Sequence, residues 1–219
     1  MGIEIAIDGP SGSGKSTVAK SLAKALGFVY IDTGAMYRAV ALYAAQHGIN
    51  WNNEVAVLGL LDEISIAIYG QNICLNGINV TVDVRSAEMG VGASVVSTYG
   101  VVRTKLVELQ RVLAKNRNVV MDGRDIGTVV LANAPVKIFL TASLEARVRR
   151  RCTELEALGH IPDLAKITAQ IKKRDYDDSN RDVAPLMIAE DAAVIDTSCL
   201  DIEGAVAAIM QIVKEKGVL

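Results

Sequence analysis

The 219-residue chain has few of the features that mark secreted, membrane-bound or metal-binding proteins. Its three cysteines are scattered and lack the spacing of metal ligands, so we expect free thiols in a reducing compartment. No apolar run approaches the length of a membrane span, and no signal-like pattern follows Met1. We therefore expect a cytoplasmic protein with no membrane partner.

Aromatic residues and excess positive charge are also scarce. Aromatic side chains make up 4% of the chain, with one Trp and two Phe, and the net charge is −2. Proteins that bind nucleic acids ordinarily offer a basic surface, and those that bind single-stranded RNA also offer aromatic rings for stacking. We therefore expect no nucleic-acid partner.

A glycine-rich loop near the N-terminus is the most informative stretch of the chain. It matches G-x-x-x-x-G-K-[ST], and it lies between an apolar run at 3–7 and a helical pattern at 17–26. This order of strand, glycine loop and helix is typical of a phosphate-binding loop. The expected ATP-binding residues are Gly9, Pro10, Ser11, Gly12, Ser13, Gly14, Lys15, Ser16 and Thr17.

The residue types in this loop suit a nucleoside triphosphate. Glycines allow successive backbone N–H groups to turn toward phosphate oxygens, and the helix N-terminus favours an anion. Lys15 would neutralise charge on the β- and γ-phosphates, and the Ser16 hydroxyl is placed to bind Mg²⁺. The alternative interpretation is a glycine-rich turn that binds nothing.

The rest of the chain alternates apolar strands with helical patterns. Short apolar strands are expected at 29–31, 119–121, 136–140 and 193–195, the last as a buried strand, which predicts an α/β fold with a mostly parallel sheet. Between 64 and 84 the pattern changes to short strands separated by Gly70-Gln71-Asn72 and by Asn76-Gly77, a strong hairpin signal. We therefore expect one domain over 1–219, with a core at about 1–62 and 100–219 and a small antiparallel insert at about 63–99.

Two charged helical segments follow the fourth strand. The first begins at Ser143 and carries the catalytic candidates Arg147, Arg150 and Arg151, and a Gly/Pro turn leads to the second at 163–175. Such a pair could form a lid at about 147–176 whose arginines close over a transferring phosphoryl group, or it could be a solvated surface. The charge-rich run 174–181 is either a solvated loop or a group of phosphate and sugar ligands.

Four motifs taken together resemble those of the bacterial-type cytidylate kinases. They are the glycine loop, Asp32-Thr33-Gly34-Ala35-Met36-Tyr37-Arg38, Asp122-Gly123-Arg124-Asp125-Ile126-Gly127-Thr128-Val129-Val130, and Arg174-Asp175-Tyr176-Asp177-Asp178-Ser179-Asn180-Arg181. The resemblance spans essentially the whole chain. It implies a P-loop kinase fold with a five-stranded parallel sheet flanked by helices, a nucleotide-monophosphate-binding insert and a helical lid. The implied reaction transfers a phosphoryl group from ATP to CMP or dCMP with Mg²⁺, in a protein that we expect to be monomeric.

The resemblance also implies roles for individual residues in substrate binding. Ser94, Arg103 and Asp125 would recognise the cytosine edge; Arg38, Arg124 and Arg181 would hold the acceptor phosphate; Arg174 and Asp178 would lie around the ribose, and Thr33 beside the base. Ser179 stands where relatives often have arginine, so one positive charge near the ribose is expected to be absent.

These assignments agree with the chemistry of the substrate. An aspartate accepts a hydrogen bond from the cytosine amino group, whereas it would repel the carbonyl that uracil has there. A P-loop kinase for another acceptor, such as shikimate or dephospho-coenzyme A, is the main alternative. A GTPase switch is disfavoured because the chain has no Asn-Lys-x-Asp motif. The preference between CMP and dCMP stays open.

Overall fold

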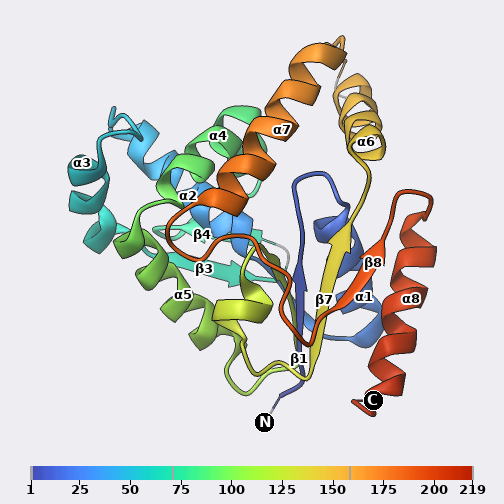
Figure 1. Ribbon diagram of the computed structural model, residues 1–219. Helices are drawn as coiled ribbons and strands as arrows, with labels where there is room; N and C mark the ends of the chain where they lie inside the picture. The colour runs from blue at the N-terminus through green and yellow to red at the C-terminus, as the bar shows by residue number, and fades with distance from the viewer. Residues whose placement is uncertain (1, 71, 158, 219) are drawn as a thin grey trace.

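The computed structural model describes residues 2–70, 72–157 and 159–218, and a parallel sheet forms its centre (Figure 1). The strand order is β2-β6-β1-β7-β8, and each neighbouring pair is parallel. The strands are β1 (Glu4–Asp8), β2 (Val29–Asp32), β6 (Val119–Gly123), β7 (Val136–Thr141) and β8 (Ala193–Asp196). The predicted five-stranded parallel sheet is confirmed.

Helices cover both faces of this sheet. On one face α1 (Lys15–Leu26) and α8 (Ile202–Glu215) bury Leu22 and Ile209 against Ile5 and Ile138. On the other face, α5 (Gly100–Ala114) and the short helix η3 (Ile126–Val130) pack against residues such as Met121. The result is a three-layer α/β/α core, in which the carboxyl ends of the strands are free to receive the loops of the site.

The expected antiparallel insert forms a second, three-stranded sheet. Its strands are β3 (Ile66–Tyr69), β4 (Asn72–Leu75) and β5 (Ile78–Asn79), and they precede η2 (Asp83–Arg85) and α4 (Ala87–Val96). Asn76 and Gly77 have φ values of 49° and 80°, as the predicted two-residue hairpin turn requires. The predicted turn residue Gln71 lies outside the described residues.

The insert has no separate core. Its apolar side chains pack on α2 (Thr33–Gln46), with α3 (Glu54–Gly59) and η1 (Leu61–Glu63) connecting the two. Strand β5 ends at Asn79, because the Thr81 hydroxyl donates to the Asn79 side chain and accepts from the amide of Ile73, which replaces the regular ladder.

Helices α6 (Leu144–Ala157) and α7 (Leu164–Asn180) form an antiparallel pair that projects beyond the sheet (Figure 1). Val148, Ile167 and Ile171 make a small core between them. Two sequence expectations need correction. The solvated-loop alternative for 174–181 is wrong, since α7 continues through Asn180. Strand β8, expected to be buried, is an edge strand in which only Ile195 is buried. No helix in the described ranges is long and apolar enough to cross a membrane.

Because β1 packs closely against β7, we expect that Gly9 cannot be replaced by a larger residue without loss of stability. A Cβ atom there would lie 2.0 Å from the backbone oxygen of Leu140. We expect Gly9→Ala to lower the free energy of unfolding by about 3 kcal/mol or more, because backbone atoms must move apart. Gly48→Ala is the matched control: Gly48 has φ of 67° but no atom within 4 Å of a Cβ, so a loss of about 1–2 kcal/mol is expected. Equal losses in urea denaturation would contradict this account.

Candidate active site

The glycine loop brings Lys15 to the start of α1. Gly12 and Gly14 have φ values of 76° and 86°, which turn the backbone before the helix begins. The Lys15 side chain is buried, and its Nζ donates to the carbonyl oxygen of Pro10 at 3.1 Å. Burial lowers the pKa of Lys15 to about 7, and the guanidinium of Arg124 adds to the fall. An anion bound in the loop would therefore stabilise the charged form of Lys15.

Asp122, at the end of β6, faces the loop. Its carboxylate accepts hydrogen bonds from Ser16 Oγ at 2.7 Å and from the Tyr30 hydroxyl at 2.8 Å. Burial raises the pKa of Asp122 to about 6, and the charge of Asp32 raises it further. A hydroxyl beside a buried carboxylate is a pair of hard oxygen ligands that suits Mg²⁺.

The protein would supply only part of the coordination shell of that cation. In the described part of the chain, no three His, Cys, Asp or Glu side chains are grouped as metal ligands. Magnesium in phosphoryl-transfer enzymes is usually held by one or two protein groups together with water and substrate phosphates. The pair formed by Ser16 and Asp122 fits this arrangement.

Asp125 lies between two arginines, where sequence reasoning expects the base-recognition site. One carboxylate oxygen bonds to Nη2 of Arg103, and the other is 3.6 Å from Nη2 of Arg181. The three side chains are nearly inaccessible, and Arg103 also donates to the carbonyl of Ser97 at 3.1 Å. The guanidinium carbon of Arg103 lies 5.5 Å from the ring centre of Tyr37. The carboxylate and its arginines are thus held in fixed positions.

A second group of charges lies around Asp178. Arg124 Nε donates to its carboxylate at 2.6 Å. Although burial opposes it, the guanidinium groups of Arg124 and Arg174 hold the pKa of Asp178 below its usual value. Burial lowers the pKa of Arg174 to about 10, with a further contribution from the charge of Arg124. Within the described chain, Arg174 Nε has no hydrogen-bond partner. Positive charge therefore accumulates here, as an anion site requires.

The remaining predicted substrate residues lie on α2 and α4. Arg38 donates to the carbonyls of Val84 and Ser86 at 3.1 and 3.2 Å, so it joins α2 to the insert. Thr33 Oγ1 donates to the backbone oxygen of Asp122 at 2.7 Å. Ser94 lies close to Arg103, because Ser97 bonds to both residues. The roles of Arg38, Thr33 and Ser94 toward a substrate stay predictions.

The three candidate arginines of α6 have different surroundings. Arg147 is buried and donates to the carbonyl of Ser11 at 3.1 Å and to Asp175 at 2.6 Å. Arg150 reaches the loop through the carbonyl of Gly12 at 3.4 Å. Arg151 forms an exposed pair with Glu154. Burial lowers the pKa of Arg38, although the charge of Asp32 opposes the fall.

Sequence reasoning missed several groups that support this site. Asp8 accepts from the amides of Ile126 and Gly127, Tyr30 bonds to Asp122, and Thr197 Oγ1 bonds to the carbonyl of Ser13 at 2.9 Å. Asp8 and Asp122 share one sequence signal, an aspartate at the end of a buried strand. No local pattern marks Thr197, which reaches the loop from the edge of the sheet.

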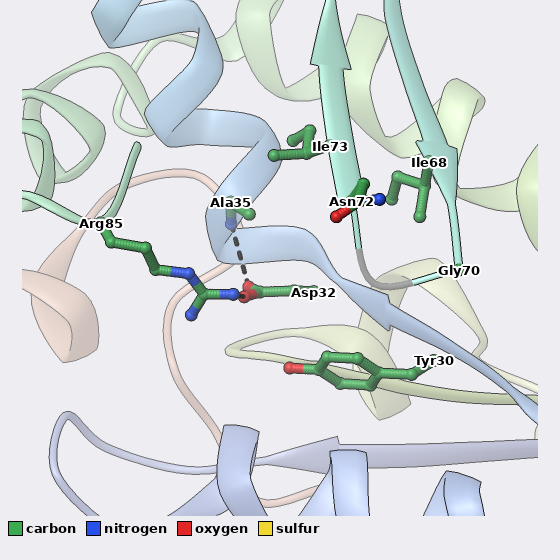
Figure 2. A pocket seen from close by; sticks show the side chains of 8 residues that line it. All are labelled: Tyr30, Asp32, Ala35, Ile68, Gly70, Asn72, Ile73 and Arg85. Carbon is green, nitrogen blue, oxygen red and sulfur yellow. Dashed lines mark hydrogen bonds and ion pairs between the residues drawn. The ribbon is translucent and has the colours of Figure 1, made fainter. Parts of the chain in front are cut away.

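A small cavity lies beside the site, between the start of α2 and the β3–β4 hairpin (Figure 2). Arg85 of the insert forms an ion pair with Asp32 at its edge, at 3.1 Å, and Asp32 also accepts from the amide of Ala35. None of the predicted site residues lines this cavity. The ion pair attaches the insert to the core near Asp122.

The glycine loop at the carboxyl edge of a five-stranded parallel sheet, with buried arginines around it, defines a P-loop kinase. The model of the cytidylate kinase family matches residues 5–215. The chain belongs to that family.

Individual relatives agree with this assignment. The chain is 50% identical to a cytidylate kinase of Geobacillus sp. strain WCH70, over 98% of this chain and 97% of the relative. It is 48% identical to a cytidylate kinase of Thermosipho melanesiensis, over 99% of each. A solved structure of an uncharacterised protein from Eubacterium ventriosum has the same fold, with a TM-score of 0.55, 17% identity and 99% of each chain covered.

The lowered pKa of Lys15 predicts how stability changes with pH. Between pH 7 and 10 the unfolded chain keeps this lysine protonated while the folded protein releases the proton, so the unfolded state binds more protons and stability rises with pH. We expect the free energy of unfolding of the wild type, relative to Lys15→Met, to increase by at most about 1.4 kcal/mol per pH unit. Parallel curves for the two proteins in denaturant titrations would show that Lys15 has an ordinary pKa.

Proposed function

We propose that the protein transfers the γ-phosphoryl group of ATP to CMP or dCMP, giving ADP and CDP or dCDP. The observation that carries this proposal is the buried carboxylate of Asp125 between Arg103 and Arg181, beside a cluster of further arginines. A carboxylate held in this way can accept from the cytosine amino group while a guanidinium donates to the ring acceptors.

Phosphoryl transfer requires alignment and charge neutralisation more than covalent participation by the protein. In our proposal the glycine loop and Lys15 hold the donor phosphates, and Arg38, Arg124 and Arg181 hold the acceptor phosphate. Arg174 and Asp178 lie around the ribose, with Thr33 and Ser94 beside the base. Ser16 and Asp122 would hold Mg²⁺, which would supply positive charge to offset that of the donor phosphates.

The domain roles follow from the same proposal. Residues of about 63–99 serve as the monophosphate-binding insert, and α6 with α7 serves as the lid at about 147–176. Contacts of Arg147 and Arg150 with carbonyls of the glycine loop support a lid that acts on the donor phosphates. We also propose that the protein is a monomer and works in the cytoplasm.

The lid proposal predicts a graded effect of arginine substitutions along α6. Arg147→Ala and Arg150→Ala should lower kcat and kcat/KM together by about 10²-fold, since one preorganised electrostatic contact contributes on this order. Arg151→Ala should also lower kcat, whereas Arg149→Ala is the matched control, because Arg149 lies exposed on the same helix. Steady-state kinetics with CMP as the varied substrate tests this. If all four variants resemble the wild type, these arginines do not act on the transferring phosphoryl group.

The base-recognition proposal predicts a change in substrate preference. Asp125→Ala should lower kcat/KM for CMP at least about tenfold, because a hydrogen bond to a charged group contributes about 1.5 kcal/mol or more. Activity on UMP should fall much less, since uracil has no amino group to donate to this carboxylate. The quantity to measure is the ratio of kcat/KM for CMP to that for UMP. An unchanged ratio would mean that the base is recognised elsewhere.

A further inference from the structure

Asp8 is a buried carboxylate for which the proposed reaction has no direct use. It is the last residue of β1 and immediately precedes Gly9 of the glycine loop. Its two oxygens accept hydrogen bonds from the backbone amides of Ile126, at 2.8 Å, and Gly127, at 2.7 Å. These two residues directly follow Asp125. One side chain thus joins the strand that leads into the donor loop to the segment that carries the base-recognition carboxylate.

The surroundings of Asp8 disfavour the ionised form of its carboxylate. The residue is only 5% exposed, and burial raises its pKa to about 6. Lys137, whose side chain also borders Gly127, pairs with Asp191 at 2.9 Å. An ionised carboxylate offers two acceptors to two amides, whereas an asparagine could satisfy only one of them. A carboxylate at this position is therefore required to bind the amides of both Ile126 and Gly127.

We infer that Asp8 is a positioning residue for base selection, which holds Asp125 at a fixed place relative to the glycine loop. With the two following amides bound to Asp8, the backbone at Asp125 cannot shift without breaking a buried hydrogen bond. The side chain of Asp125 is fixed from its other end by Arg103 and Arg181. The inference rests on the proposed function, because it assumes that Asp125 recognises the base.

Asp8→Asn tests this, because it places an amide N–H₂ against one of the two backbone N–H groups. We expect the CMP:UMP ratio of kcat/KM to fall at least about fivefold, since a displacement of about 1 Å can cost about 10²-fold in rate. The KM for ATP should change less than about twofold. The ratio does not depend on the fraction of folded enzyme, so a residue that only stabilises the fold would leave it unchanged.

Asp191→Asn is the matched control, because it removes a carboxylate that pairs with Lys137 and touches neither Ile126 nor Gly127. Its ratio should equal that of the wild type. Gly127→Ala is a second variant for the case in which Asp8→Asn fails to fold. A Cβ atom at Gly127 would lie 3.3 Å from Lys137 Cδ and 3.4 Å from Asp8 Oδ2, so it crowds the Asp8 carboxylate slightly, and we expect the ratio to fall by less than in Asp8→Asn. Should turnover be too slow, the ratio of calorimetric affinities for CMP and UMP tests base selection in the bound ground state.

Measuring Asp125→Ala in parallel distinguishes a failure of the positioning role of Asp8 from a failure of the proposed function. If Asp125→Ala lowers the ratio but neither Asp8→Asn nor Gly127→Ala does, the positioning role is wrong and the proposed function stands. If Asp125→Ala leaves the ratio unchanged, base recognition by Asp125 is wrong, and the role of Asp8 falls with it.

Discussion

The parallel pairing of β1 with β6 is the constraint on which the site depends. In this register Ile7 lies opposite Asp122 and Asp8 lies opposite Gly123, so the glycine loop and the Gly-Arg-Asp segment leave the sheet side by side. The contact between Ser16 and Asp122 follows from this register, and so does the contact between Asp8 and the amides after Asp125. A shift by one residue would separate the proposed donor and base sites and would turn buried side chains to the opposite face.

The charges collected at this edge are stabilised mainly by each other. Asp125 pairs with Arg103 and Arg181, and Asp178 pairs with Arg124, in surroundings from which water is largely excluded. Removing one partner of such a buried pair typically costs about 3–5 kcal/mol, because the other charge is left uncompensated. The arrangement therefore has few alternative conformations. An anion would also stabilise the charge of Arg174, since burial lowers its pKa and its Nε is unpartnered within the described chain.

Features encoded by short stretches could be predicted from the sequence. The strand, loop and helix around Lys15, the hairpin turn at Asn76-Gly77 and the parallel sheet are local or periodic signals, and the structure has them. Contacts set by strand order could not be predicted. Nothing near Tyr30 shows that β2 lies beside β6 and so brings its hydroxyl to Asp122. The charged run 174–181 resembles a loop in composition, yet it is helical because Ile167 and Ile171 anchor α7 against α6, and Asp178 is buried against Arg124.

The central claim is that the arginine-flanked Asp125 makes this P-loop kinase selective for cytosine nucleotides. The most direct test is steady-state production of ADP by the wild-type protein with ATP and Mg²⁺, over a panel of CMP, dCMP, UMP, AMP, GMP and shikimate. The account predicts that kcat/KM for CMP or dCMP exceeds that for every other acceptor by at least about tenfold, because a site built around a buried hydrogen bond rejects an acceptor that cannot make it. Equal or higher kcat/KM with UMP, a purine nucleotide or shikimate would contradict it.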